Sequence, residues 1–278
     1  MTDYQTSIGK LTDLPSMPTV ISKLHSLMND PDIGTNQVAA VVGTDAALVA
    51  RTLKLVNSPF YGFSRRVTSI DEAIAILGVN ALHQLVMTTA VFDIVQSDMI
   101  LNMHDFWLHS FGVGVFTKHL LPSAGVEVQN NALMCGILHD IGRLVLARSE
   151  PSMFSTFYFD RGGVTGTEEE IEFFGVSHQQ LGEMLAQKWN FPDEIIAATA
   201  YHHKPDQAPA EFQLMVSAIN IADVLCHTMH VGSSASAYLT EFFPSAWQKL
   251  ELNETKLENV LKRSLDEIDD TRQMLGNI

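Results

Sequence analysis

Apolar residues recur every three to four positions along most of the chain, which is the period of a helix that buries one face. Alternating apolar and polar runs between turn residues, the pattern of half-buried strands, are hard to find. We therefore expect an all-α fold. Ser69 and Glu72 have capping-box spacing at the start of one predicted helix. In the first hundred residues the pattern predicts helices near residues 20–28, 38–42, 48–56, 69–78 and 82–86.

The character of the helices changes along the chain. Residues 1–100 predict an N-terminal helical subdomain of ordinary amphipathic helices. Within residues 101–240, histidines and aspartates interrupt apolar helices, which predicts a second helical subdomain with a polar site. There, the stretch from Arg161-Gly162-Gly163 to Glu168-Glu169-Glu170 predicts a surface loop or a short helix. Residues 241–278 predict a C-terminal amphipathic helical tail that packs back on the body through Leu257, Val260, Leu261, Leu265 and Ile268.

Composition narrows the class of function. The 278 residues carry 17 lysines and arginines against 32 aspartates and glutamates, a formal charge of −15, which speaks against binding nucleic acid or an anionic membrane. A hydrophobic fraction of 46% excludes a disordered chain. Cys135 and Cys226 lie in apolar stretches, so a disulfide framework and a cysteine-rich zinc site are excluded. Because the chain has no signal-peptide-like start and no apolar run near about 18 residues, we expect a cytoplasmic protein.

The most informative window is residues 132–147, ALMCGILHDIGRLVLA, in which His139, Asp140 and Arg143 are the clearly polar residues. A helix this apolar on all sides is buried. A buried ionised carboxylate costs several kcal/mol without a partner. Asp140 therefore needs a metal ion, a hydrogen-bonding neighbour or an ion pair with Arg143, and the sequence leaves these alternatives open.

Other imidazoles and carboxylates are spaced so that they can join such a site. Asp105 and His109 are four residues apart, on one face of a predicted helix. Ser177 and Gln180 have capping-box spacing, which places His178 in the first turn of the next helix. These residues therefore join the candidate ligands, although Asp105 is equally well explained as a carboxylate that interacts with a helix N-terminus.

The last candidates follow along the chain. His202 and His203 end the helix that begins at Pro192, where the helix dipole favours a cation, although His203 is also explained as an exposed helix end. Asp223 lies within another apolar stretch. The whole set of imidazoles and carboxylates suits a divalent transition metal such as iron, manganese, zinc or nickel. Surfaces or ordinary packing account for the remaining histidines, which are His25, His83, His104, His119, His227 and His230.

Landmarks of one known family run through almost the whole chain. In the first half they are Leu14-Pro15, Asp45 before Ala46-Ala47-Leu48, Asn57-Ser58 with Tyr61, and Ser69 through Leu77-Gly78. In the second half they are Trp107, His109, the run GILHDIGRLVL, Phe174-Gly175, His178, Trp189 and His202-His203. On these residues the chain resembles the HDOD-domain proteins of the HD superfamily, which are related to the HD-GYP phosphodiesterases. The resemblance implies an HD-superfamily helical bundle with the N-terminal subdomain packed against it.

The same resemblance implies a set of metal ligands. The four defining ligands of the HD superfamily would be His109, His139, Asp140 and Asp223, with Asp140 bridging where two metals bind. Further histidines extend the site in HD-GYP proteins, and those matched here are His178, His202 and His203. Asp105 lies where a glutamate usually precedes the first histidine by four residues. HDOD proteins commonly lack much of this set and are usually treated as catalytically inactive, whereas this chain retains it.

Two departures from the catalytic relatives bear on activity. Arg143 replaces the usual lysine, and the two cations are not interchangeable against a phosphate. Lys204-Pro205-Asp206 follows the histidine pair in place of a Gly-Tyr-Pro motif, so cyclic di-GMP hydrolysis is not expected.

The resemblance favours a signal-transduction or regulatory module with a mono- or dinuclear metal site and a protein partner. The alternative is a metal-dependent phosphohydrolase that acts on a phosphodiester, a nucleotide or another phosphate-containing small molecule. In that hypothesis Asp140 and Arg143 are catalytic: a metal-activated water attacks phosphorus and Arg143 orients the substrate. Neither hypothesis includes a nucleic-acid or membrane partner.

Overall fold

The structure is a computed structural model that describes residues 14–28, 33–95, 100–126, 131–160, 166–235 and 242–275. Every regular element in these ranges is helical, so the predicted all-α fold is confirmed. The chain forms two compact units, of which the smaller comprises residues 15–96. The remaining described residues belong to the larger unit, including the C-terminal tail.

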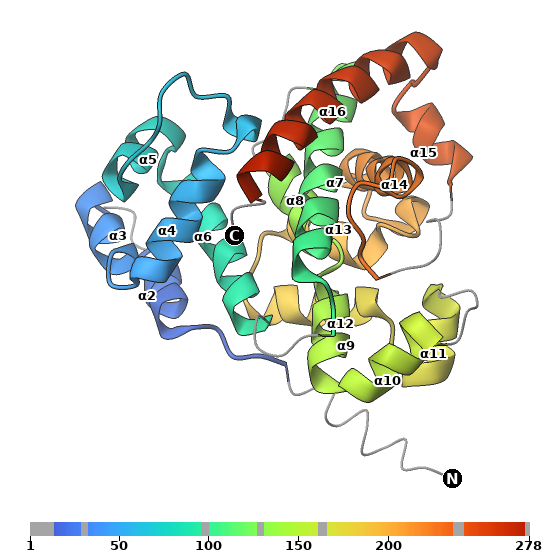
Figure 1. Cartoon of the computed structure of the whole chain (residues 1–278), viewed down its shortest axis with the longest axis horizontal. Helices are drawn as coiled ribbons and strands as arrows, with labels where there is room; N and C mark the ends of the chain where they lie inside the picture. Colours follow the sequence, from blue (N-terminus) through green and yellow to red (C-terminus); the bar gives the residue numbers. More distant parts are fainter. Residues whose placement is uncertain are drawn as a thin grey trace. The chain divides into compact units, whose positions relative to one another are not determined.

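The smaller unit buries one face of each of its helices, as the periodicity predicts. Ile21, Leu24, Val38 and Val42 are among its fully buried side chains. The Ser69 hydroxyl accepts a hydrogen bond from the Glu72 N–H at 3.1 Å, so half of the predicted capping box forms, whereas the Glu72 carboxylate accepts from the Thr68 N–H at 2.8 Å. The elements of this unit (Figure 1) are α2 (Thr19–Met28), α3 (Thr35–Val42), α4 (Ala46–Val56), η1 (Pro59–Tyr61), α5 (Ile70–Leu77) and α6 (Val79–Val95).

The larger unit is organised around one long buried helix, α7 (Met103–Ser123), against which three other helices pack. These three are α8 (Ala132–Leu138), α14 (Gln213–Thr228) and α16 (Glu254–Leu275). A second group consists of α12 (His178–Lys188), which packs on both α9 (Ile141–Ser149) and α13 (Asp193–Tyr201). The remaining elements are α10 (Pro151–Ser155), the π-helical turn η2 (Thr156–Asp160), α11 (Thr167–Phe174), η3 (Pro205–Gln207) and α15 (Pro244–Lys249).

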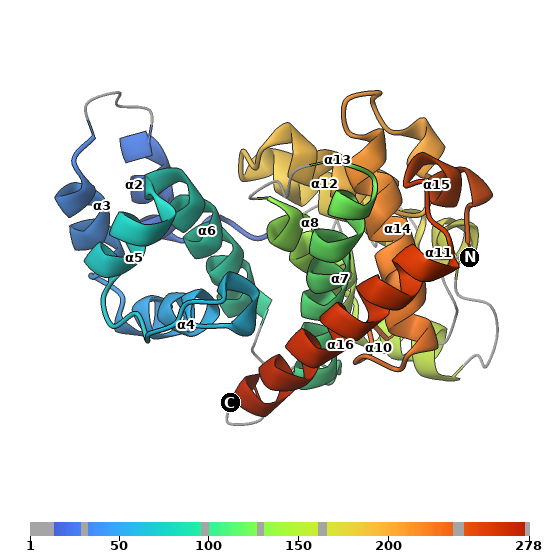
Figure 2. The same cartoon turned by 90° about the horizontal axis from the view of Figure 1, so that it is seen from above.

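The tail forms the amphipathic helix that the sequence predicts. Helix α16 lies along α7 in both views (Figures 1 and 2) and buries Val260 and Ile268. Glu267 contacts two residues of α7, Lys118 at 3.1 Å and His119 at 3.0 Å. The tail is therefore part of the same compact unit as the polar site.

The apolar window 132–147 is not one continuous helix, as its pattern suggested, but two. Helix α8 ends at Leu138 and α9 begins at Ile141, so His139 and Asp140 lie in the turn between them. The backbone of Asp140 leaves helical geometry, with φ −100° and ψ 16°. The two side chains face the same interior space, since Nε2 of His139 lies 3.5 Å from Oδ2 of Asp140.

Two close approaches between helices place the polar residues. A Cβ atom on Gly136 would lie 2.3 Å from the backbone of Gly114, so α7 and α8 touch at their glycines. A Cβ atom on Gly142 would lie 1.8 Å from the carbonyl oxygen of His178, so α9 and α12 meet there. Only glycine permits such contacts, because any side chain would force the backbones apart.

Three further predictions concern the rest of the chain. Cys135 and Cys226 are free and buried, as expected of packing residues. Arg161-Gly162-Gly163 lies outside the described residues, whereas Glu168–Glu170 forms the first turn of α11. Within the described ranges, no helix has the length and apolarity that crossing a bilayer requires.

Candidate metal centre

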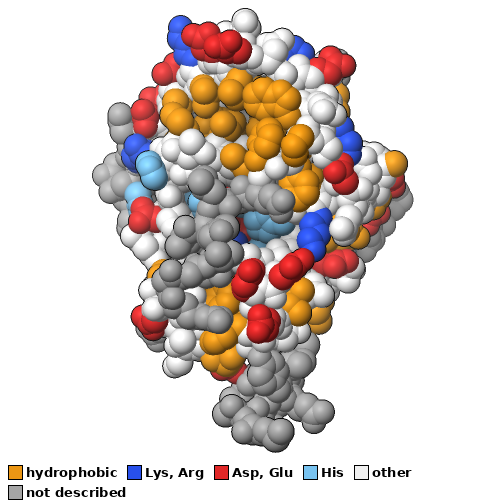
Figure 3. Space-filling view, turned by 90° about the vertical axis from the view of Figure 1, so that its right-hand side faces the viewer, with side chains coloured by type: hydrophobic (Ala, Val, Ile, Leu, Met, Phe, Trp, Pro, Cys, Tyr) orange, Lys and Arg blue, Asp and Glu red, His pale blue; other side chains and the backbone are white. Residues whose placement is uncertain are grey.

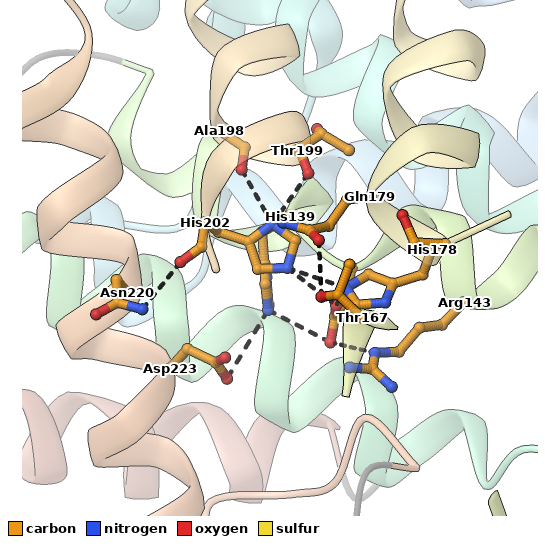
Figure 4. A network of polar contacts seen from close by, with 12 residues as sticks. His139, Arg143, Thr167, His178, Gln179, Ala198, Thr199, His202, Asn220 and Asp223 are labelled. Carbon is orange, nitrogen blue, oxygen red and sulfur yellow. Dashed lines mark hydrogen bonds and ion pairs between the residues drawn. The ribbon is translucent and has the colours of Figure 1, made fainter. Parts of the chain in front are cut away.

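Seven of the eight predicted ligands meet in the interior of the larger unit. They come from α7, the α8–α9 turn, α12, the end of α13 and α14, which are far apart in the sequence. Figure 4 shows His139, His178, His202 and Asp223 turned toward one another. All but His203 are at most 1% exposed. The ligands brought together are His109, His139, Asp140, His178, His202, His203 and Asp223.

Three side chains form the tightest group. Nε2 of His178 and Nε2 of His202 are 3.2 Å apart. Oδ1 of Asp140 lies 3.3 Å from the first nitrogen and 3.5 Å from the second. Four ligands at bonds of about 2.0–2.1 Å in a tetrahedron are about 3.3 Å from one another, so these separations match those of atoms bound to one zinc-sized ion.

The outer ring nitrogens fix which atoms carry protons. Nδ1 of His178 lies 2.7 and 2.8 Å from the two carboxylate oxygens of Glu170, so it donates its proton to that carboxylate. Nδ1 of His202 lies 3.2 Å from the Ala198 carbonyl oxygen and 3.0 Å from that of Thr199, and donates to them. In the neutral imidazoles both Nε2 atoms then present lone pairs to each other and to the carboxylate oxygen of Asp140.

His139 is oriented in the same way. Its Nδ1 donates to the Gly136 carbonyl oxygen at 2.6 Å, which leaves Nε2 as an acceptor. That Nε2 lies 3.5 Å from Oδ2 of Asp140 and 3.9 Å from Oδ1 of Asp223. Among the described residues, neither this nitrogen nor Oδ1 of Asp140 makes a hydrogen bond.

This donor set fits a metal ion. Lone pairs that converge in a dry interior without a proton between them repel one another, and a divalent cation removes that repulsion. Metal-bound histidines characteristically donate their other nitrogen to a carboxylate or a carbonyl, as His139, His178 and His202 do. Imidazole with carboxylate suits iron, manganese, zinc or nickel.

Electrostatics keeps the ligands in the forms that bind metals. Burial lowers the pKa of His139 to about 4, although neighbouring carboxylates oppose the shift. Burial and the adjacent imidazoles hold the pKa of His203 well below its usual value. Burial alone would raise the pKa of Asp140, but the Arg143 guanidinium and the nearby imidazoles hold it well below its usual range. At neutral pH the imidazoles of His139 and His203 are thus neutral and the Asp140 carboxylate is ionised.

Arg143 is part of the network and is enclosed by it. Its Nε lies 3.0 Å from Oδ2 of Asp140, and a terminal nitrogen lies 3.8 Å from Glu170. The guanidinium also lies over the ring of Tyr158, 5.3 Å from its centroid. The Arg143 side chain is buried, with 3% of the residue exposed. The ion pair with Asp140, one of the alternatives that the sequence left open, therefore exists, and it uses Oδ2, so that Oδ1 of Asp140 can bind another partner. Its predicted role toward a substrate stays a prediction.

For two residues the sequence left two interpretations open, and the structure places each of them. Asp105 does not reach the cluster: its carboxylate is 45% exposed, accepts a hydrogen bond from Asn102 Nδ2 at 2.7 Å and lies beside His104. It is therefore a carboxylate of the first turn of α7, the alternative interpretation of its position. His203 is half-buried and lies in the same group as Asp140, His178 and His202.

Two residues that take part in the cluster carry no clear signal in the sequence. Glu170 was assigned to a surface stretch, yet it is fully buried and accepts hydrogen bonds from the Tyr158 hydroxyl and from the backbone and ring of His178. His227 was assigned to packing, yet its Nε2 lies 3.4 Å from Oδ1 of Asp223. The spacing of four between Asp223 and His227 could have indicated this contact.

The fold and the site together define a helical bundle with a buried cluster of histidines and aspartates that could hold a metal ion. The HDOD domain family model matches residues 14–205, more than half of the chain. The chain therefore belongs to the HDOD family, as its landmarks suggested. An uncharacterized protein of Treponema pallidum (strain Nichols) is 26% identical over 219 residues, which cover 77% of this chain and 42% of that protein. The chain thus spans about two fifths of the length of this curated relative.

Solved structures show the same fold. An HDOD domain protein of unknown function from Geobacter sulfurreducens is 27% identical, with a TM-score of 0.66 over 98% of this chain and 94% of that one. A candidate phosphohydrolase from Shewanella amazonensis SB2B is 23% identical, with a TM-score of 0.73 over 95% of this chain and 97% of that one. At 23% identity, the similarity to the Shewanella structure is evidence for a shared fold only.

Proposed function

We propose that this chain is a regulatory HDOD module of a signalling pathway that holds one or two divalent transition-metal ions and acts through a protein partner. One observation carries the metal site: Nε2 of His178, Nε2 of His202 and Oδ1 of Asp140 lie 3.2–3.5 Å apart, while Nδ1 of each ring faces oxygen acceptors. Membership of the HDOD family supports the regulatory part of the proposal.

Burial favours a structural role for the ion. The ligands come from α7, the α8–α9 turn, α12, the end of α13 and α14, and nearly all are inaccessible to solvent. An ion bound here would connect five segments that otherwise meet through repelling lone pairs. Metal occupancy would then govern the packing of the larger unit, because binding free energy for the folded state adds to its stability.

A second candidate function is a metal-dependent phosphohydrolase. The observation that favours it is partial access: His203 is half-buried and the His227 side chain is 13% exposed. On the face shown in Figure 3, histidine side chains are visible in a hollow beside acidic and apolar side chains. A bound metal would supply an activated water and neutralise developing charge. Asp140 would hold that metal, and Arg143 would hold Asp140.

One experiment separates these functions. The protein, purified without a metal-binding tag, is reconstituted with Fe²⁺, Mn²⁺, Zn²⁺ or Ni²⁺, and its metal content is measured by elemental analysis. The loaded protein is then tested on a phosphodiester and nucleotide panel, with Asp140→Ala as the site variant and Asp105→Ala as the matched control outside the cluster.

Each result has a defined meaning. One or two ions per chain without turnover supports the regulatory module. Metal-dependent turnover that Asp140→Ala abolishes and Asp105→Ala leaves intact supports the phosphohydrolase. Clearly substoichiometric metal after reconstitution with every ion contradicts both functions, because each requires the site to bind metal.

A further inference from the structure

A second group of donors lies beside the first, around Asp223. Oδ1 of Asp223 is 3.0 Å from Nε2 of His109 and 3.4 Å from Nε2 of His227. The ligand atoms of these three residues all lie within 4.8 Å of one another. His109 and Asp223 are expected ligands of the HD superfamily, but His227 belongs to none of the ligand positions that the resemblance implies.

The state of His109 indicates that this group is incomplete without a cation. The side chain is fully buried, and neither ring nitrogen makes a hydrogen bond within the described part of the chain. A buried imidazole with two unsatisfied nitrogens is costly, since each polar atom has lost its water. Its Nε2 lies 3.0 Å from Oδ1 of Asp223, a separation that two ligand atoms of one ion can also have.

His227 is placed to complete this group. It lies one helical turn after Asp223 on α14, so both side chains project from the same face. Its ring lies 4.9 Å from that of His109, centroid to centroid, at an angle of 52°. The rings are therefore not stacked on one another.

The two groups are contiguous. His139 and Asp140 lie between them, because Oδ1 of Asp140 faces His178 and His202, whereas Nε2 of His139 lies 3.9 Å from Oδ1 of Asp223. The space between the two groups is thus lined by ligands of both. This arrangement suits two ions side by side rather than one ion shared by all donors.

We propose that His227, with His109 and Asp223, forms a second metal subsite whose outer ligand is His227. The inference rests on the metal site of the proposed function and specifies how many ions it holds and which residue completes the second. Two imidazoles and one carboxylate make a nitrogen-rich subsite, which prefers ions such as Zn²⁺ and Fe²⁺ to Mg²⁺. His227 is the most exposed ligand of this subsite, with 13% of its side chain accessible.

The test is a Co²⁺ titration of the full chain, followed by visible absorption, which reports coordination number, and by equilibrium dialysis. The wild type should bind two Co²⁺ ions. His227→Ala should lose one ion, or bind the weaker one at least 10-fold less tightly, and keep the tighter one unchanged. The control is His104→Ala, which removes an exposed imidazole outside both groups.

Two outcomes would overturn the inference while leaving the proposed function intact. In the first, His227→Ala binds as many Co²⁺ ions as the wild type, with the same affinities. In the second, the wild type binds a single ion, and His227→Ala binds that ion equally tightly. A wild type that binds no Co²⁺ contradicts the proposed function itself. If His227→Ala does not fold, His227→Gln is titrated in its place. If His227 only forms a hydrogen bond with Asp223, glutamine should replace it and both ions should still bind. If His227 is a metal ligand, the glutamine variant should lose one ion.

Discussion

Replacing Glu170 with glutamine isolates the charge of the buried carboxylate that orients His178. The carboxylate accepts hydrogen bonds from the Tyr158 hydroxyl, from the backbone N–H of His178 at 2.7 Å and from its Nδ1. It also lies 3.8 Å from the Arg143 guanidinium. Glutamine keeps the size and shape of the side chain, so the change tests electrostatics and hydrogen bonding with little effect on packing.

The expected cost follows from counting these bonds. Hydrogen bonds to a charged acceptor contribute about 1.5–3 kcal/mol each, and neutral ones about 1 kcal/mol. The single carbonyl oxygen of glutamine keeps at most two of the three bonds, as neutral ones, and its amide group then faces a donor or Arg143. One charged bond is lost and two are weakened, so the metal-free protein should lose about 3 kcal/mol of unfolding free energy.

The assay is urea unfolding at pH 7 with a chelator present, followed by circular dichroism. The matched control is Glu168→Gln, which removes an exposed carboxylate from the same first turn of α11. Metal affinity gives a second readout, because loss of an orienting partner typically weakens binding about 10–100-fold. If Glu170→Gln proves as stable as the control and binds metal as tightly, Glu170 does not hold His178 and our account of the donor orientation is wrong.

The remaining predictions use the same protein. Burial raises the pKa of the Glu170 carboxyl, but His178 and Arg143 more than offset this effect and lower the pKa from 4.5. The ionised carboxylate therefore stabilises the fold fully above about pH 4.5, and this stabilisation disappears as the pH falls through the lowered pKa. The difference in unfolding free energy between wild type and Glu170→Gln should vanish on acidification, and a constant difference would contradict this. In metal-free protein, Asp140→Ala should cost about 3 kcal/mol in urea unfolding, because Arg143 loses its ion pair at 3.0 Å; a near-neutral result would mean that water solvates the pair. Gly142→Ala should lower the melting temperature and abolish metal binding, since its Cβ would lie 1.8 Å from the His178 carbonyl oxygen, and normal binding would show that the helices can separate without cost. Metal-loaded protein should not hydrolyse cyclic di-GMP, and efficient cleavage in a chromatographic assay would refute the argument from the missing positioning motif.

The helices could be predicted because local signals and tertiary packing agree. Periodic apolar residues, the Ser69 cap and the Ser177 capping box all have their expected structures. The break between α8 and α9 could not be predicted, because residues 132–147 contain neither proline nor a polar turn cluster. That break depends on how α8 meets α7 at Gly136 and how α9 meets α12 at Gly142, which are contacts distant in sequence.

The candidate site shows the same limit. A spacing of four residues links Asp105 to His109 and Asp223 to His227, yet only the second pair meets, because Asp105 lies in the first turn of α7 with its carboxylate turned to Asn102. Glu170 was hidden in a run of three glutamates, which usually indicates a solvated surface. Its burial depends on the fold of α11 onto α12, which local sequence does not reveal.

The most direct test of the metal centre is anomalous diffraction from crystals grown with the preferred ion, collected on both sides of its absorption edge. The account predicts a peak within bonding distance, about 2.0–2.2 Å, of Oδ1 of Asp140 and of Nε2 of His178 and His202. Protein that is fully loaded by elemental analysis but shows no peak among these three atoms would contradict it.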